Sequence, residues 1–283
     1  SFKELWNFGS RLMVLGVVNA IHSEIYQVVV GKFYPAAQLG QFNRADAFKR
    51  LPEQNLSAIL QRVTLPTMAP IQNNFKRLRN SYAQLINATF LVTSFSMIIL
   101  SAVSVQLVEV LIGKQWHMAG EFLQILCFSS IFYPLSSVNQ SILKTKGKAN
   151  HLLYIGLSMK LLTIPLILIV IFINIKTMLY AMIAFKFIGY FITAHYGGKL
   201  INYGTMKQLN DFIPTALILF IIYMLMFFTQ KNLPLPSYQV LIILLIEGIV
   251  VSISLFELFK IDSYLFLRNV AKEKIRTLRS NNK

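Results

Sequence analysis

Charged side chains are scarce in this chain. Only 13% of its residues are Asp, Glu, Lys or Arg, whereas a soluble domain carries about 25%. Hydrophobic residues make up 55% of the sequence, and the mean hydropathy is +0.57. This amount of charge is too small to cover a water-facing surface. The composition therefore predicts an all-α integral membrane protein, a bundle of several spanning helices.

Residues that carry catalytic or metal chemistry are also few. The sequence has one cysteine, Cys127, in an apolar run, which excludes an intramolecular disulfide. The four histidines are scattered, with no pair at metal-ligand spacing. The eleven acidic residues form no D-x-D pair, and there is no P-loop, G-x-S-x-G or H-E-x-x-H motif. The sequence therefore predicts no enzyme, no metal and no cofactor.

Eight stretches are apolar and long enough to cross a bilayer, which takes about 20 residues of helix. They cover residues 9–31, 50–72, 82–112, 118–143, 150–173, 177–198, 212–229 and 238–259. The links between them leave no room for a soluble domain. The chain starts with Ser1 and shows no signal peptide, so we expect it to be the C-terminal part of a longer protein.

Lysine and arginine gather at alternate links. The richer side holds Lys3, Lys76, Arg77, Arg79, Lys144, Lys146, Lys148, Lys199, Lys207 and the tail from Lys260 to Lys283. The positive-inside rule places this side, and both chain ends, in the cytoplasm. The tail is expected near anionic lipid headgroups. The net charge of +16 thus follows from membrane topology, and nucleic acid is not an expected partner.

One link on the other side breaks this rule. Residues 32–49 are expected outside, yet FNRADAFKRLP holds Arg44, Lys49 and Arg50 around Asp46. Three interpretations stay open. The cations bind an anionic ligand at the mouth of the bundle, the segment is amphipathic and rests on lipid headgroups, or Asp46 pairs with Lys49 or Arg50 in a structural loop.

The second span, EQNLSAILQRVTLPTMAPIQ, is polar and interrupted by proline. Its stripe of Gln54, Ser57, Gln61 and Thr64 falls on one helical face, and Asn55 and Arg62 lie beside that stripe. Pro66 and Pro70 are expected to kink the helix. Such a helix lines a wet cavity or packs through polar contacts with its neighbours.

Several charges fall at membrane depth, where an arginine costs about 3 kcal/mol on insertion scales. Arg62 lines a substrate path, forms an ion pair with Glu24 or Glu121, or snorkels to the membrane surface. Lys160 and Lys186 either line the path or snorkel to the membrane surface. Glu24 is the candidate for ion coupling. Cations outnumber acids in these spans, which favours an anionic substrate.

Several runs of the sequence resemble Wzx-type flippases for lipopolysaccharide, O-antigen and exopolysaccharide, in the multidrug/oligosaccharidyl-lipid/polysaccharide superfamily. These runs are FGSRLMVLGVVNAI, YQVVVGKFYPAAQLGQFNRADAFKRLPEQNLSAILQRVTLPTMAPIQ, LQILCFSSIFYPLSSVNQSILKTKGKA and HYGGKLINYGTMKQL. The resemblance covers most of residues 1–210 as a whole-sequence pattern, without a short catalytic signature.

The resemblance implies two six-helix lobes around a central cavity. Residues 1–210 would be the second lobe, 211–260 two additional helices, and 261–283 a basic cytoplasmic tail. Family members move undecaprenyl-pyrophosphate-linked oligosaccharide across the bacterial cytoplasmic membrane by rocking of the lobes. Implied partners are this lipid-linked sugar, membrane lipids, the missing N-terminal lobe, and polymerase or assembly proteins. The pyrophosphate suits Arg62, Arg44, Lys49, Arg50, Lys160 and Lys186, with Gln61 and Asn55 nearby.

Other functions remain open at this point. An ion-coupled multidrug antiporter of the same superfamily is the main alternative, although the shortage of buried acids argues against a cationic substrate. A membrane polymerase or acyltransferase would need a large periplasmic loop or a His/Asp constellation, and neither is visible. A structural scaffold is disfavoured by the cost of placing Arg62 in the membrane.

Overall fold

The computed structural model describes residues 2–171 and 173–281, without the side chains of 2–5, 7–8, 11–12, 14–15, 18–23, 65, 149, 160, 162, 164–171 and 273–281. The described chain is helical and contains no strand. In chain order the helices are α1 (Phe2–Phe33), α2 (Ala36–Met68), η1 (Ala69–Ile71), α3 (Phe75–Ile112), η2 (Lys114–Trp116), α4 (His117–Ser130), α5 (Phe132–Thr145), α6 (Ala149–Ile171), α7 (Ile175–Lys199), α8 (Thr205–Asn232), α9 (Ser237–Leu258) and α10 (Asp262–Asn281).

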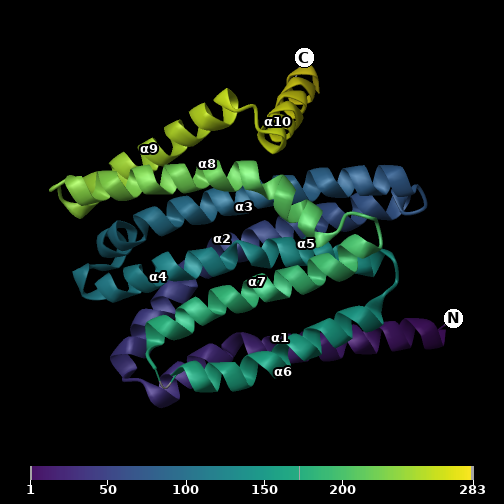
Figure 1. Cartoon of the computed structure of the whole chain (residues 1–283), viewed down its shortest axis with the longest axis horizontal. Coiled ribbons are helices and arrows are strands. Elements are labelled where there is room, and N and C mark those ends of the chain that lie inside the picture. The colour runs from purple at the N-terminus through teal and green to yellow at the C-terminus, as the bar shows by residue number, and fades with distance from the viewer. Residues whose placement is uncertain (1, 172, 282–283) are drawn as a thin grey trace.

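The helices α1 to α8 run side by side, and the links between them alternate between two ends of the bundle (Figure 1). The helices α4 and α5 follow one another along a single pass. The pair α1 and α6 forms one side, and α8 and α9 lie on the opposite side against α3. The final helix, α10, runs across the direction of the others.

Five helical segments in the described part of the chain are long and apolar enough to cross a membrane by length and composition. They are Phe75–Ile112, Lys114–Thr145, Ile175–Lys199, Thr205–Asn232 and Ser237–Leu258. The predicted all-helical membrane bundle is thereby confirmed as a fold class. The segments agree with the predicted spans within several residues at each end, as the apolar periodicity allows.

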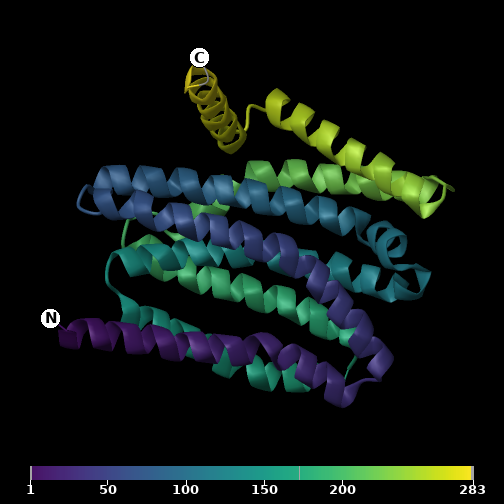
Figure 2. The same ribbon diagram turned by 180° about the vertical axis from the view of Figure 1, so that it is seen from behind.

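The prediction that residues 32–49 form an outside loop is wrong. The helix α2 begins at Ala36, directly after Pro35, so only two residues separate it from α1. Proline is favoured at a helix start because its missing N–H has no intrahelical partner there. Residues 36–51 hold no further proline, and Pro52 lies inside the helix. Figure 2 shows that α2 changes direction along its length, as expected of a helix with internal proline.

The fourth predicted span, 118–143, is divided at Ile131 into α4 and α5. Pro134 lies in the first turn of α5, where it breaks no intrahelical hydrogen bond. A kink was predicted at Pro66 and Pro70, at the end of the second span. In the structure α2 continues past Pro66 and ends at Met68, before Pro70.

Candidate functional site

A cavity of about 550 Å³ opens between α1, α2, α5, α6 and α7. Most of its polar lining comes from α2 and α5. The polar and aromatic lining residues are Tyr26, Gln27, Phe42, Asp46, Lys49, Arg50, Glu53, Gln54, Gln61, Tyr133, Ser136, Ser137, Gln140, Lys144, Phe185, Lys186, Thr163 and Thr193. Because a hydrocarbon environment tolerates few such groups, this is the polar cavity that the second span predicts.

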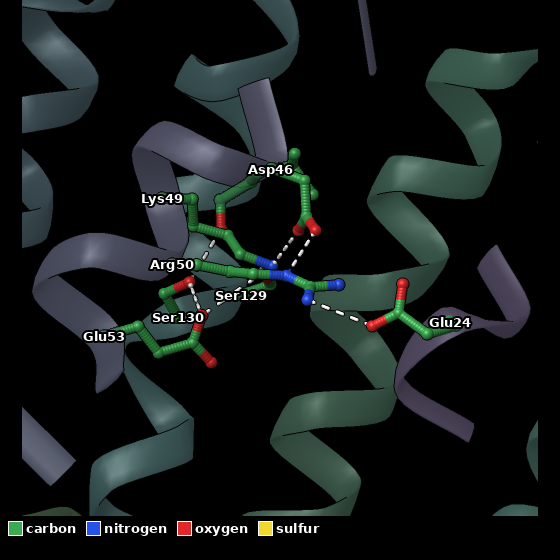
Figure 3. Close-up of polar contacts among 8 residues, drawn as sticks. Glu24, Asp46, Lys49, Arg50, Glu53, Ser129 and Ser130 are labelled. Carbon is green, nitrogen blue, oxygen red and sulfur yellow. Dashed lines mark hydrogen bonds and ion pairs between the residues drawn. The ribbon is translucent and has the colours of Figure 1, made fainter. Parts of the chain in front are cut away.

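Ion pairs along one face of α2 form one wall of this cavity (Figure 3). The Lys49 Nζ lies 2.7 Å from Asp46 Oδ1 and 3.7 Å from Glu53 Oε2. The Arg50 Nε donates to Asp46 Oδ2 at 2.6 Å. These residues are spaced by three and four positions, so a single helix face brings them together. The sequence-based pairing of Asp46 with Lys49 and Arg50 is thus confirmed, but in a helix rather than in a loop.

Two further contacts tie this face to neighbouring helices. The Arg50 Nη1 donates to Glu24 Oε1 on α1 at 3.1 Å. The Ser130 hydroxyl, at the end of α4, donates to Glu53 Oε2 at 3.0 Å. Figure 3 shows Arg50 lying between Asp46 and Glu24. The quartet of Asp46, Lys49, Arg50 and Glu53, which we call the α2 quartet, therefore connects α1 and α4 through α2.

Burial makes the α2 quartet costly to disrupt. The exposed fractions of Asp46, Lys49 and Glu53 are 5%, 6% and 7%. Removing one partner of a buried ion pair costs about 3–5 kcal/mol, because the remaining charge is left uncompensated. Three carboxylates already pair with Lys49 and Arg50, so a bound anion would have to compete with Asp46, Glu53 and Glu24 for them.

Two other cations line the same cavity without a carboxylate within ion-pair distance among the described residues. These are Lys186 of α7 and Lys144 of α5. The Lys186 Nζ lies 5.0 Å from the centroid of the Tyr133 ring, a cation–π contact between α7 and α5. An aromatic face stabilises the ammonium group and leaves its three donors to other acceptors. The cavity therefore presents two cations to an incoming anion.

The structure separates the residues that the sequence groups as site candidates. Gln61 lines the cavity with Lys49, Arg50 and Lys186, whereas Asn55 and Arg62 are exposed on another face of α2. Among the described residues, Arg62 forms no ion pair with Glu24 or Glu121. Glu24 instead pairs with Arg50, and Glu121 pairs with Lys176. These placements leave the functional roles of the residues as predictions.

Two remaining candidates lie elsewhere. Arg44 is exposed and packs over the Trp116 ring, with its Cζ 5.3 Å from the ring centroid, near the link between α3 and α4. The side chain of Lys160, in α6, lies outside the described residues.

The sequence interpretation misses Lys144 and Tyr133 as cavity residues. Lys144 reads as one of several lysines at a cytoplasmic link, and only the path of α5 brings it to the cavity. Tyr133 lies within the predicted fourth span, but nothing in the sequence pairs it with Lys186. The α2 quartet has a readable signal, since Asp46, Lys49, Arg50 and Glu53 recur at helical spacing.

Comparisons with known proteins find similarity to polysaccharide biosynthesis proteins. Residues 1–121 match the family described as polysaccharide biosynthesis protein. The chain is 26% identical over 152 residues to the teichuronic acid biosynthesis protein TuaB of Bacillus subtilis (strain 168), covering 54% of this chain and 32% of TuaB. It is 24% identical over 162 residues to the lipopolysaccharide biosynthesis protein WzxC of Escherichia coli (strain K12), covering 57% of this chain and 33% of WzxC. The chain thus spans about a third of the length of these relatives.

Among solved structures, the fold matches the lipid II flippase MurJ in its inward closed conformation. The TM-score is 0.71 at 17% sequence identity, and the match covers 88% of this chain and 52% of MurJ. At this identity the likeness concerns the fold.

Proposed function

We propose that this multi-pass bacterial inner-membrane chain is one lobe of a flippase, because residues 1–121 match the polysaccharide biosynthesis protein family and the fold matches about half of a lipid flippase. Its substrate is an undecaprenyl-pyrophosphate-linked oligosaccharide that moves across the cytoplasmic membrane for polysaccharide or lipopolysaccharide biosynthesis. The protein acts as a transporter rather than an enzyme. Residues 1–210 form the lobe, 211–260 add two helices, and 261–283 form the cytoplasmic tail.

The observation that carries this proposal is the charge of the cavity. Its lining holds the cations Lys49, Arg50, Lys144 and Lys186 against the acids Asp46 and Glu53. A pyrophosphate group complements this excess, and charge-assisted hydrogen bonds to it are short and strong in a low-dielectric site. Lys186 and Lys144 would meet the pyrophosphate first, since Lys49 and Arg50 are already paired.

The polar groups beside these cations suit a hydroxyl-rich sugar. Gln54 and Gln61 of α2 face the cavity from one side, and Ser136, Ser137 and Gln140 of α5 face it from another. Amide and hydroxyl side chains both donate and accept hydrogen bonds, so they can follow different sugar hydroxyls. Arg62 is exposed on α2 and has no ion-pair partner among the described residues. It is therefore a candidate contact to a second lobe or to substrate between the lobes.

Alternating access would then come from rocking of this lobe against a second one. Glu24 is proposed as the ion-coupling group, because protonation or cation binding there would weaken its pair with Arg50 and loosen α1 from α2. Arg44, Asn55 and Lys160 remain candidate contacts. The names of the relatives favour polysaccharide precursors over the multidrug alternative.

Translocation in proteoliposomes tests the proposal. The full-length transporter is reconstituted with a fluorescent undecaprenyl-pyrophosphate oligosaccharide, and leaflet exchange is followed by quenching with a membrane-impermeant reagent. We expect exchange well above that of protein-free liposomes, and no accumulation of an organic cation such as ethidium under an ion gradient. Cation accumulation without lipid exchange would establish the multidrug antiporter instead.

A further inference from the structure

The last membrane helix ends in a tight turn. After Leu258, the Lys260 N–H donates to Glu257 O at 3.2 Å and the Ile261 N–H donates to Phe256 O at 3.1 Å. Lys260 has a positive φ of 48°, the left-handed conformation that commonly closes a helix. Only three residues separate α9 from α10. The start of α10 is therefore held at the level where α9 leaves the bilayer.

The helix α10 packs against α3 and against this same end of α9. The rings of Tyr264 and Phe256 lie 5.8 Å apart. Arg268 forms an ion pair with Glu257. Figures 1 and 2 both show α10 running across the bundle, with its C-terminal end farthest from the other helices. A helix that crosses the spanning helices at the point where they leave the membrane lies along the membrane surface.

One face of α10 looks back toward the membrane. Tyr264 and Arg268 contact α9, so their face is the side on which the bilayer lies. Leu267 packs partly against the core, and Ala271 continues the same face by helical spacing where α10 leaves the bundle. Lys272 is exposed on the flank of that face. Between residues 260 and 283 the sequence holds seven basic and two acidic residues.

We propose that α10 is an interfacial helix that lies on the cytoplasmic leaflet and binds anionic lipid headgroups. An amphipathic helix with apolar residues on one face and basic residues beside it binds such a surface by apolar burial and charge attraction together. The tight turn after α9 pre-positions α10 for this contact. The inference depends on the membrane topology of α9 and not on the transported substrate, so it stands or falls separately from the proposed function.

Spin labels on the two sides of α10 test this placement. Ala271→Cys reports the membrane side, and Asn269→Cys reports the exposed side about 160° away on a helical wheel. Cys127 is buried, so the unsubstituted protein serves as the labelling background. In nanodiscs with phosphatidylglycerol we expect a several-fold higher ratio of oxygen to nickel-complex accessibility at 271 than at 269. Water-like accessibility at both positions would overturn the proposal.

Lipid charge is tested on the same labels. With phosphatidylcholine alone, or in Lys272→Gln/Arg276→Gln/Arg279→Gln, we expect the label at 271 to lose most of its advantage. The matched control, Lys32→Gln/Lys114→Gln/Lys231→Gln, removes three basic residues at the opposite end and should change nothing. Insensitivity to lipid charge and to the α10 substitutions would overturn anionic-lipid binding. Protection at 271 that appears only in native membranes would assign the face to a protein partner and also overturn it.

Discussion

At the scale of single residues, Lys49 is the most constrained cation in the described part of the cavity wall. It lies between Asp46 and Glu53 at an exposed fraction of 6%. The stretch around it is the one that the sequence interpretation takes for a loop. The pairing of Asp46 was readable because opposite charges three and four residues apart attract on a helix. The helix itself was not, because so many charges in a row look like a solvated link.

Replacing Lys49 tests the structural role of the α2 quartet. We expect Lys49→Met to destabilise the protein by about 3–5 kcal/mol, since Asp46 and Glu53 would stay buried with less compensation. Arg62→Gln, at an exposed position of the same helix, is the matched control and should stay within about 0.5 kcal/mol. Thermal unfolding in detergent by intrinsic fluorescence compares the two. Equal midpoints for both variants would show that the α2 quartet is not a stabilising unit.

The candidate site was only partly predictable from residue types. Lys186 was noted as a lysine at membrane depth, and the structure gives it Tyr133 as a partner. Lys144 was counted with the cytoplasmic lysines. Its place in the cavity beside α2 and α7 depends on how α5 packs, which the sequence does not show. Arg62 was favoured for its cost in a membrane, yet it lies on a face of α2 outside the cavity. Helical spacing orders residues within one helix and says little about which helices meet.

At the scale of elements, the turn between α7 and α8 connects α8 to the helices that precede it. Tyr190 donates to Gln208 Oε1 at 3.1 Å, and the Gln208 amide donates to the Tyr203 carbonyl at 3.2 Å. Gly198 lies against this carbonyl so closely that a Cβ there would come within 2.2 Å of the oxygen. The glycine is therefore required by backbone packing.

Adding one methyl group to each of two glycines tests this joint. We expect Gly198→Ala to lower stability by about 1–3 kcal/mol, because the α7–α8 turn must shift to make room. Gly204→Ala, six residues later, adds its methyl group where no heavy atom lies within 4 Å and should be nearly neutral. Unfolding midpoints and the yield of monodisperse protein measure both effects. A neutral Gly198→Ala would mean that the turn adapts without cost.

Element boundaries were predictable where apolar length decides them and not where packing does. The spans of α7 and α9 follow apolar runs bounded by turn residues, and the prediction places them within a few residues. The start of α2 was missed by fourteen residues, because its first half gains its place from buried ion pairs rather than from hydrophobicity. The final helix α10 was read only as a basic tail.

At the scale of the whole molecule, the basic residues define one end of the bundle. The links 69–74, 146–148 and 200–204 lie at this end, and the links after α1, α3, α6 and α8 lie at the other (Figure 1). Correcting α2 reduces the exception to the positive-inside rule, since Lys49 and Arg50 now lie in the cavity wall, while Arg44 stays near the link between α3 and α4. The positive-inside rule then predicts that the basic end faces the cytoplasm.

Cysteine labelling in spheroplasts measures this orientation. Leu235→Cys, between α8 and α9, should react with a membrane-impermeant maleimide in intact spheroplasts. Lys148→Cys, between α5 and α6, should react only after permeabilisation. Cys127 is buried and provides the unreactive background. The reverse labelling pattern would invert the proposed topology.

The account rests on the claim that this cavity receives an anionic lipid headgroup through Lys186. Binding of undecaprenyl pyrophosphate to the purified full-length transporter in nanodiscs measures it, with undecaprenol as the uncharged reference. A lost charge-assisted contact is worth about 1.5–3 kcal/mol, so Lys186→Met should weaken pyrophosphate binding at least about tenfold. Undecaprenol binding should not change, and Lys186→Arg should keep most of the affinity. Lys231→Met removes a lysine from the last turn of α8, outside the cavity lining, and is the control. Unchanged pyrophosphate affinity in folded Lys186→Met would contradict the account.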